Sequence, residues 1–170
     1  MWKSIGESYD GRSIYANGED VPWSAAFISF VVLNGGRAYQ GFKFSASHSE
    51  FSHDAIQAQV LGRKDKPFWG FRRTEARPAI GDIIHRNRGT GVFTFDYAEN
   101  HSSFKSHSDV VVEVTSHVAR VIGGNVGNTV SLKRVDGSGD DIQEYLLDDD
   151  GFIAANQKVI AVLKNRASEV

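Results

Sequence analysis

The pattern of apolar and polar positions predicts helices in the first part of the chain and strands in the rest. Residues 23–34 form an apolar run that ends at Gly35-Gly36, which predicts a helix with a glycine stop. A second helix is expected over 49–61, because apolar residues there roughly follow one stripe and Gly62 interrupts the pattern.

Five later segments have the β-branched, continuous or alternating pattern of strands: 82–86, 109–115, 118–122, 129–135 and 159–163. Short connections join the middle three segments, which therefore predict an antiparallel meander. Helices followed by a sheet indicate an α+β domain. The 170 residues are enough for a single domain over 1–170 with one sizeable core.

Composition removes several classes of function. The chain has 19 basic and 21 acidic residues, a net charge of −2, and so lacks the basic footprint of a nucleic-acid-binding protein. It has no cysteine, which excludes disulfides, cysteine zinc sites and a cysteine nucleophile. We see neither the apolar core of a signal peptide nor a bilayer-spanning run, and expect a protein made in the cytoplasm with no membrane partner.

Ser24 and His107 are candidates for a nucleophile and its base. Ser24 follows Pro22 in the first turn of the predicted helix, where unpaired backbone N–H groups and the helix dipole favour an attacking or anionic oxygen. His107 precedes a predicted strand, and Asn125 at the end of the next strand is expected to orient its imidazole, with Asp109 as the rival. Spacing alone is more typical of a helix cap and a surface histidine than of a catalytic pair.

Four segments, in family order, resemble motifs of the CHAP and NlpC-type amidohydrolases, papain-like enzymes that cut peptidoglycan amide bonds: Pro22-Trp23-Ser24-Ala25-Ala26-Phe27-Ile28-Ser29, Pro78-Ala79-Ile80-Gly81-Asp82-Ile83-Ile84, Ser106-His107-Ser108-Asp109-Val110-Val111-Val112 and Ile122-Gly123-Gly124-Asn125. The chain is also similar to a bacterial domain family of unknown function in this superfamily, which has serine in the cysteine position. The stretch Ser45-Ala46-Ser47-His48-Ser49 fits that second resemblance.

The resemblance implies a papain-like α+β fold, with N-terminal helices packed on an antiparallel sheet. It implies that Ser24 attacks an amide, that His107 shuttles the proton and that Asn125 orients His107, with no cofactor and no metal. The expected substrate-binding residues are Trp23, His48, Asp82 and Trp69. His48 is expected to line the cleft beside Ser24, and Trp69 to form part of the floor of a groove for sugar or peptide.

Ser24 departs from the family pattern, which has cysteine at this position. The difference matters because a helix end can ionise a thiol but not a hydroxyl. Three interpretations stay open: a working Ser-His-Asn nucleophile, an inactive site that keeps only cell-wall binding, and an engineered replacement of cysteine. We expect the first, because His107 and Asn125 are both present. The second predicts a catalytically dead binding module on the same fold.

A metal-dependent hydrolase is a further alternative, with His48 or His53 acting together with Asp82 or His85. The two earlier histidines are five residues apart, which is not the spacing that places two ligands on one helix face. A helix cap followed by a solvated face explains them better.

The expected substrate is the peptide of bacterial peptidoglycan. A protein of this kind without a signal peptide suits a phage lysin or a delivered toxin, which acts on the cell wall or in the periplasm after lysis or secretion. A delivered toxin would need an immunity protein that plugs the cleft.

Overall fold

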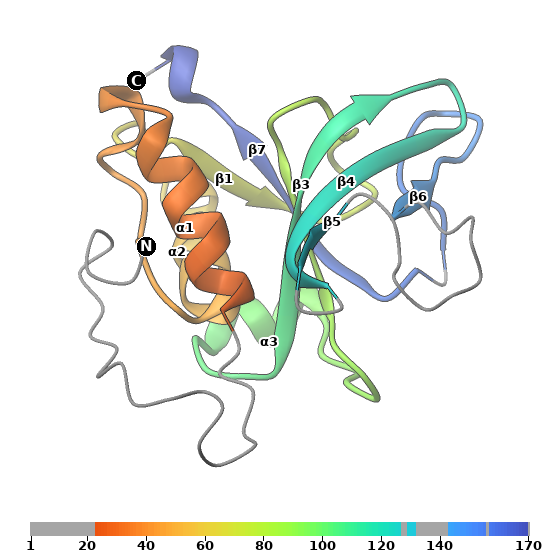
Figure 1. The fold of residues 1–170 in the computed structure, drawn as a ribbon, viewed down its shortest axis with the longest axis horizontal. Helices are drawn as coiled ribbons and strands as arrows, with labels where there is room; N and C mark the ends of the chain where they lie inside the picture. The colour runs from red at the N-terminus through yellow and green to blue at the C-terminus, as the bar shows by residue number, and fades with distance from the viewer. Residues whose placement is uncertain (1–22, 127–128, 132–142, 156, 170) are drawn as a thin grey trace.

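The computed structural model describes residues 23–126, 129–131, 143–155 and 157–169, and it shows an α+β protein with helices beside a curved antiparallel sheet (Figure 1). The helices are α1 (Ser24–Asn34), α2 (His48–Val60) and α3 (Phe95–Asn100), with short 3₁₀ turns at Arg37–Tyr39 and Ala167–Glu169. The strands are β1 (Phe68–Phe71), β2 (Ile83–Asn87), β3 (Ser106–Val114), β4 (Val118–Val126), β5 (Thr129–Ser131), β6 (Glu144–Leu146) and β7 (Val159–Asn165).

Both predicted helices are confirmed to within a residue. Gly35 caps α1, and its N–H bonds to Val32 O. Gly62 follows α2 with φ +62°, a left-handed conformation that glycine adopts without steric cost. Of the helices described, none is long and apolar enough to cross a bilayer.

The predicted meander is also confirmed, because β3, β4 and β5 pair antiparallel in chain order. Residues 132–135 of the last predicted strand lie outside the described residues. The sheet order is β1-β7-β2-β3-β4-β5, with β6 pairing on β4, so the last strand inserts between two early ones. β3 begins three residues earlier than predicted, which places His107 inside the strand rather than at its mouth.

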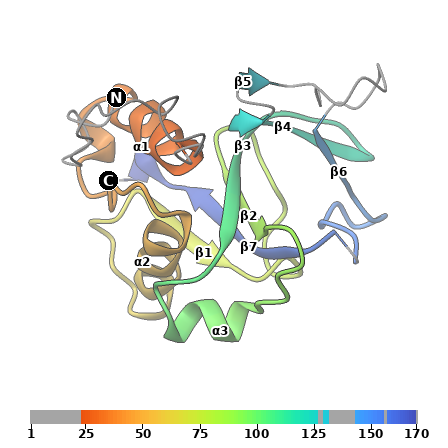
Figure 2. The same cartoon turned by 60° about the horizontal axis from the view of Figure 1, so that its bottom comes forward.

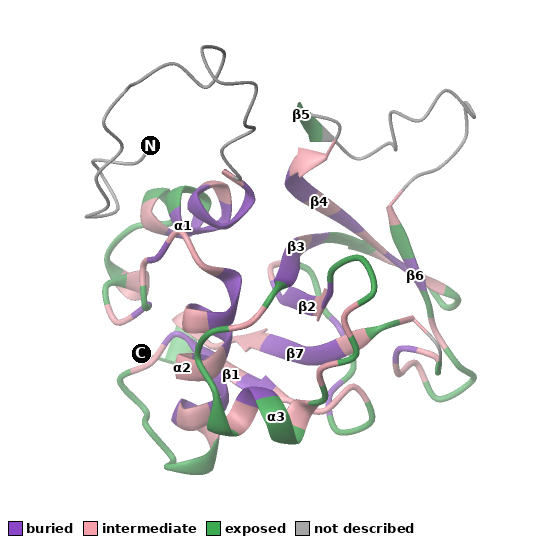
Figure 3. Ribbon diagram, turned by 90° about the horizontal axis from the view of Figure 1, so that it is seen from below, coloured by how far each residue is buried: buried purple, intermediate pink, exposed green. Residues whose placement is uncertain are grey.

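The sheet separates two apolar clusters. One of them includes residues of α1 and α2, which lie together beside the sheet in Figure 2. Ile83 belongs to the cluster on the helix side and Ile84 to the other, as alternating side chains of a strand require. The buried residues follow β3, β4, β7 and the inner parts of α1 and α2 (Figure 3). On β3 the same alternation puts His107 and Asp109 on one face and Ser108 on the opposite face.

Candidate functional site

Ser24 is the first residue of α1 and is 3% exposed. Its Oγ lies 2.7 Å from Nε2 of His48, which is itself the first residue of α2. Two helices therefore begin at the Ser24 hydroxyl, and their first-turn N–H groups and dipoles bring positive potential to it. Pro22, which the sequence places at the entry of the first helix, lies outside the described residues.

His48 is held in its neutral form. Burial is the main reason why the pKa of its imidazole lies well below the ordinary 6.5. Neighbouring basic groups lower this pKa further, in decreasing order His107, His85, Arg88 and Arg86. Its Nδ1 is buried with no hydrogen-bond partner among the described residues. Within the described residues, every group that acts on this ring lowers its pKa and so disfavours a positive charge on it.

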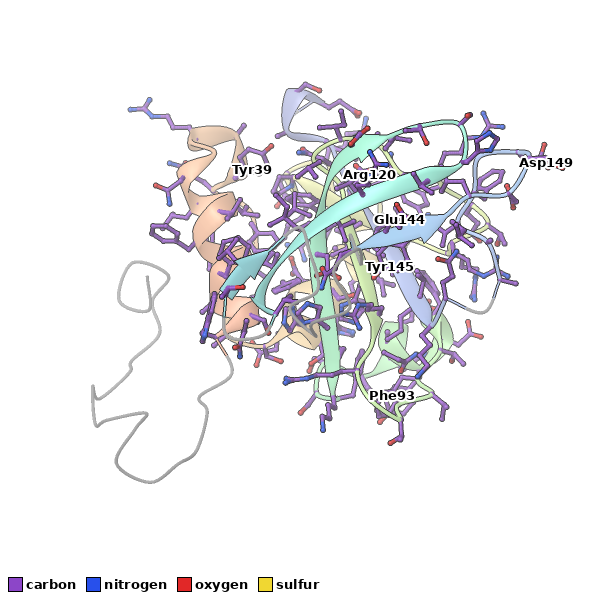
Figure 4. All side chains as sticks on the ribbon, turned by 45° about the vertical axis from the view of Figure 1, so that its right-hand side comes forward. Tyr39, Phe93, Arg120, Glu144, Tyr145 and Asp149 are labelled. Atoms are coloured by element: carbon purple, nitrogen blue, oxygen red, sulfur yellow. The ribbon has the colours of Figure 1, made fainter. Side chains whose placement is uncertain are left out.

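His107, in contrast to His48, has a carboxylate beside its ring. It lies two residues before Asp109 on β3, on the same face, and its Nε2 is 2.9 Å from Asp109 Oδ1. The second carboxylate oxygen is 3.2 Å from Arg86 Nε and 3.3 Å from the hydroxyl of Tyr145. Tyr145 lies on β6 beside Glu144 (Figure 4). Side chains thus hold both oxygens of this carboxylate.

The Asp109 carboxyl stays ionised although it is buried. Burial alone would raise its pKa, but the hydrogen bond and charge of His107, together with Arg86, outweigh burial and lower the pKa. Burial, and then the negative charge of Asp109, raise the pKa of Tyr145 well above 10, which keeps its hydroxyl protonated as a donor. Gly123 gives the carboxylate its space, since a Cβ there would overlap Asp109 Oδ1.

Ser24, His107 and Asn125 line one cavity of about 200 Å³. Its other lining residues are Arg86, Arg88, Val126 and Gln143. The rings of His48 and His107 are in contact, with centroids 4.9 Å apart and planes at 53°. The structure therefore brings together the alcohol, imidazole and carboxamide that lie far apart in the sequence.

Hydrogen bonding within this group differs from the expected pattern. Ser24 contacts His48 rather than His107, and Asp109 rather than Asn125 binds the His107 ring. Because β3 starts at Ser106, both members of the His107–Asp109 pair are strand residues, and Nε2 rather than Nδ1 reaches the carboxylate. The Asn125 side chain makes no hydrogen bond within the described residues, and its backbone is left-handed, with φ 59°.

The other predicted substrate-binding residues are placed as follows. Trp23 lies at the N-cap of α1, with its ring edge-on to Phe27. Asp82 is buried outside the cavity, where it accepts backbone N–H groups and pairs with Lys164. Trp69 lies on β1, far across the sheet order from β4, and its indole donates to a backbone carbonyl.

The residues of the metal alternative have separate partners. His53 Nδ1 is bonded to a backbone carbonyl at 2.9 Å, and His85 Nδ1 to Ser108 Oγ at 2.8 Å. Asp82 pairs with Lys164 and accepts hydrogen bonds from backbone N–H groups. Within the described part of the chain, no three histidine or acidic residues are grouped so that they could hold a metal ion.

Sequence reasoning missed Arg86, Arg88 and Tyr145. A usable signal was the run Arg86-Asn87-Arg88 at the end of a predicted strand, because alternation puts both arginines on one face. Tyr145 had no such signal, since it reaches Asp109 only through the pairing of the three-residue strand β6 with β4.

One comparison with known proteins places the chain in a family. A bacterial protein family described as "uncharacterized protein conserved in bacteria" (DUF2272) matches residues 1–164. No curated protein and no solved structure matches the chain significantly.

Proposed function

We propose that the chain, which belongs to the DUF2272 family, is a hydrolase that cuts amide bonds in the peptide of bacterial peptidoglycan. The observation that carries the proposal is one cavity lined by both Ser24 and His107, with the His107 ring bonded to the buried Asp109 carboxylate. A nucleophile, a proton acceptor and a group that orients the acceptor are what acyl transfer requires. The proposed fold is papain-like, with α1 carrying the nucleophile and β3 the histidine.

His107 is a better general base than His48. A general base becomes an imidazolium when it takes the proton, and the ionised Asp109 at 2.9 Å stabilises that charge on His107. The same charge on His48 would be buried with no counterion among the described residues, in line with its lowered pKa. The Asp109 bond occupies Nε2 of His107 and leaves Nδ1 for proton transfer.

His48 has a positioning role in this scheme. A buried unpaired N–H is rarer than a buried unpaired acceptor, so we assign the ring proton to Nε2 and leave Nδ1 as the bare atom. Nε2–H then donates to Ser24 Oγ across the 2.7 Å contact. This leaves the proton of the Ser24 hydroxyl available to His107.

The reaction follows in two steps. Ser24 Oγ bonds to the carbonyl carbon while His107 takes its proton, and first-turn N–H groups of α1 receive the developing oxyanion. The C–N bond breaks as His107 passes that proton to the leaving nitrogen. Water then attacks the resulting ester with His107 again as base, which releases a carboxylic acid and restores Ser24.

The choice of peptidoglycan rests on the resemblance of four ordered segments to cell-wall amidohydrolases. The α1–β3–β4 arrangement around the cavity supports it, because each of the segments that carry Ser24, His107 and Asn125 contributes to the lining. We further propose that the protein acts on the cell wall after lysis or delivery. An immunity or inhibitor protein would act by filling this cavity.

Digestion of purified sacculi tests the proposal. The wild-type protein should release peptide fragments, and mass spectrometry of their new amine and carboxyl ends identifies the bond that is cut. Ser24→Ala and His107→Ala should release none, whereas Ser24→Cys keeps a nucleophile at the same position and should retain cutting. Equal release by the wild type and Ser24→Ala would rule out the proposed nucleophile. Sacculi that are bound by every variant but never cut would support a binding module instead.

A further inference from the structure

Two arginines line the Ser24 cavity, and they have different partners. Arg86 is tied to Asp109 through its Nε at 3.2 Å and is mostly committed to that carboxylate. Arg88 follows two residues later, just beyond the end of β2, and is exposed at the rim. Its guanidinium forms no ion pair or side-chain hydrogen bond within the part of the chain that the structure describes.

Among the described residues, the cavity lining offers no negative charge to balance Arg88, since none of those lining residues is acidic. The buried carboxylate behind it, Asp109, is already shared by His107 and Arg86. The positive charge of Arg88 extends to the His48 ring beside Ser24, since it contributes to the lowered pKa of His48. The N-terminus of α1 adds positive potential from another direction.

The size of the cavity limits what can balance this charge. About 200 Å³ is less than the ~300–1,000 Å³ of pockets that enclose a whole small ligand, so a short part of a longer substrate fits there. A guanidinium binds a carboxylate through two parallel hydrogen bonds. Peptides supply such a group close to an amide bond.

We propose that Arg88 binds a carboxylate of the substrate, so that the enzyme prefers peptides with a free carboxylate next to the amide that is cut. The inference rests on the proposed hydrolase function and names the chemical feature that this site would select. Arg86 keeps its structural role with Asp109, and Arg88 is the specificity-determining residue.

The test uses two substrates and matched variants. One substrate is a peptidoglycan stem peptide with its carboxylates free, and the other is the same peptide with those carboxylates converted to carboxamides. For the wild type, kcat/KM should be about 10- to 100-fold higher for the free carboxylates, the range that a charged hydrogen bond provides. Arg88→Gln should bring this ratio close to one, and Arg88→Lys should restore part of it.

Arg37→Gln is the control, because it removes the same charge from an exposed residue beyond the opposite end of α1, and it should keep the wild-type ratio. A second measurement separates this inference from the hydrolase function. Calorimetry on Ser24→Ala should show tighter binding of the free-carboxylate peptide, and Arg88→Gln in that background should remove the difference. This result supports the carboxylate site even if neither peptide is cut. Equal affinity for the two peptides, no affinity for either, or a preference that persists in Arg88→Gln overturns the inference.

Discussion

Asp82 and Asp109 are both about 1% exposed and both pair with a basic side chain, yet their surroundings differ in kind. Asp82 accepts the backbone N–H groups of Ala79 and Asn165, so its carboxylate joins segments of chain. Asp109 contacts side chains at both oxygens, including the ring of His107. A buried carboxylate bound to backbone holds a fold together, whereas one bound to titratable side chains sets their charge and orientation.

The largest expected effect is that of Asp109→Asn on activity. The amide removes the charge that stabilises the His107 imidazolium, and kcat should fall by about 10³–10⁴-fold. The free energy of unfolding should also fall, because Arg86 loses its counterion, so kcat is compared for the folded fraction of each variant. Sacculus digestion and urea unfolding measure the two quantities on the same preparation. A loss of less than tenfold would assign the orientation of His107 to another residue.

Asp82→Asn should lower stability without lowering activity. It weakens two backbone hydrogen bonds and leaves Lys164 without its counterion, so the free energy of unfolding should fall by about 2–4 kcal/mol. The activity of the remaining folded protein should stay close to that of the wild type. Urea unfolding at neutral pH measures the stability, and a selective fall in kcat of the folded fraction would place Asp82 in the site after all.

Acid titration probes His85, which is fully buried on β2 and bonded to Ser108 of β3. Burial first, then His107 and Arg86, lower the pKa of His85 to about 3. Between pH 6.5 and about 3 the unfolded chain therefore binds a proton that the folded chain does not. The free energy of unfolding should fall with decreasing pH by about 1.4 kcal/mol per unit from this group.

His85→Asn keeps a polar partner for Ser108 and should remove that part of the slope. Urea unfolding between pH 7 and 4 measures it. Asp109 acts at lower pH, because its carboxylate is stabilising until the pH falls through its lowered pKa. An unchanged slope in His85→Asn would show that this ring is not buried in its neutral form.

The smallest expected effect is that of Asn125→Gly. Glycine keeps the left-handed backbone at φ 59° and removes a side chain that makes no hydrogen bond to His107. The value of kcat/KM should stay within about threefold of the wild type. A loss above 100-fold, measured on the same sacculi, would make Asn125 the orienting residue and contradict the role given to Asp109.

Local pattern predicts much of this fold. The apolar run of α1, the stripe of α2 and the meander from β3 to β5 are long or strongly patterned, and each is confirmed. The strands β1 and β6, with four and three residues, and the six-residue α3 are too short to give a clear period. The insertion of β7 between β1 and β2 depends on pairing between distant segments, which local pattern does not encode.

For the site, local position in the sequence predicts the main residues, whereas the contacts between them depend on packing. Helix-start position suggested Ser24, strand-end positions suggested His107 and Asn125, and the resemblance named all three. These three residues do line one cavity. The choice of Asn125 over Asp109 assumed that two side chains on one strand face do not reach each other. In the structure both residues lie within β3, and His107 reaches Asp109 through Nε2. The Ser24–His48 contact joins the starts of two helices, and only their packing reveals it.

Gly123 and Gly124 are neighbours in β4, and their missing side chains face opposite sides of the sheet. A methyl group at Gly123 would meet the Asp109 carboxylate, and one at Gly124 would lie 2.6 Å from Phe27 of α1. These two adjacent glycines thus determine how closely α1 packs on β4 and where the Asp109 carboxylate lies. The helix that bears Ser24 and the strand that bears His107 are therefore both positioned against the same two residues of β4, and a side chain at either glycine would displace one of them.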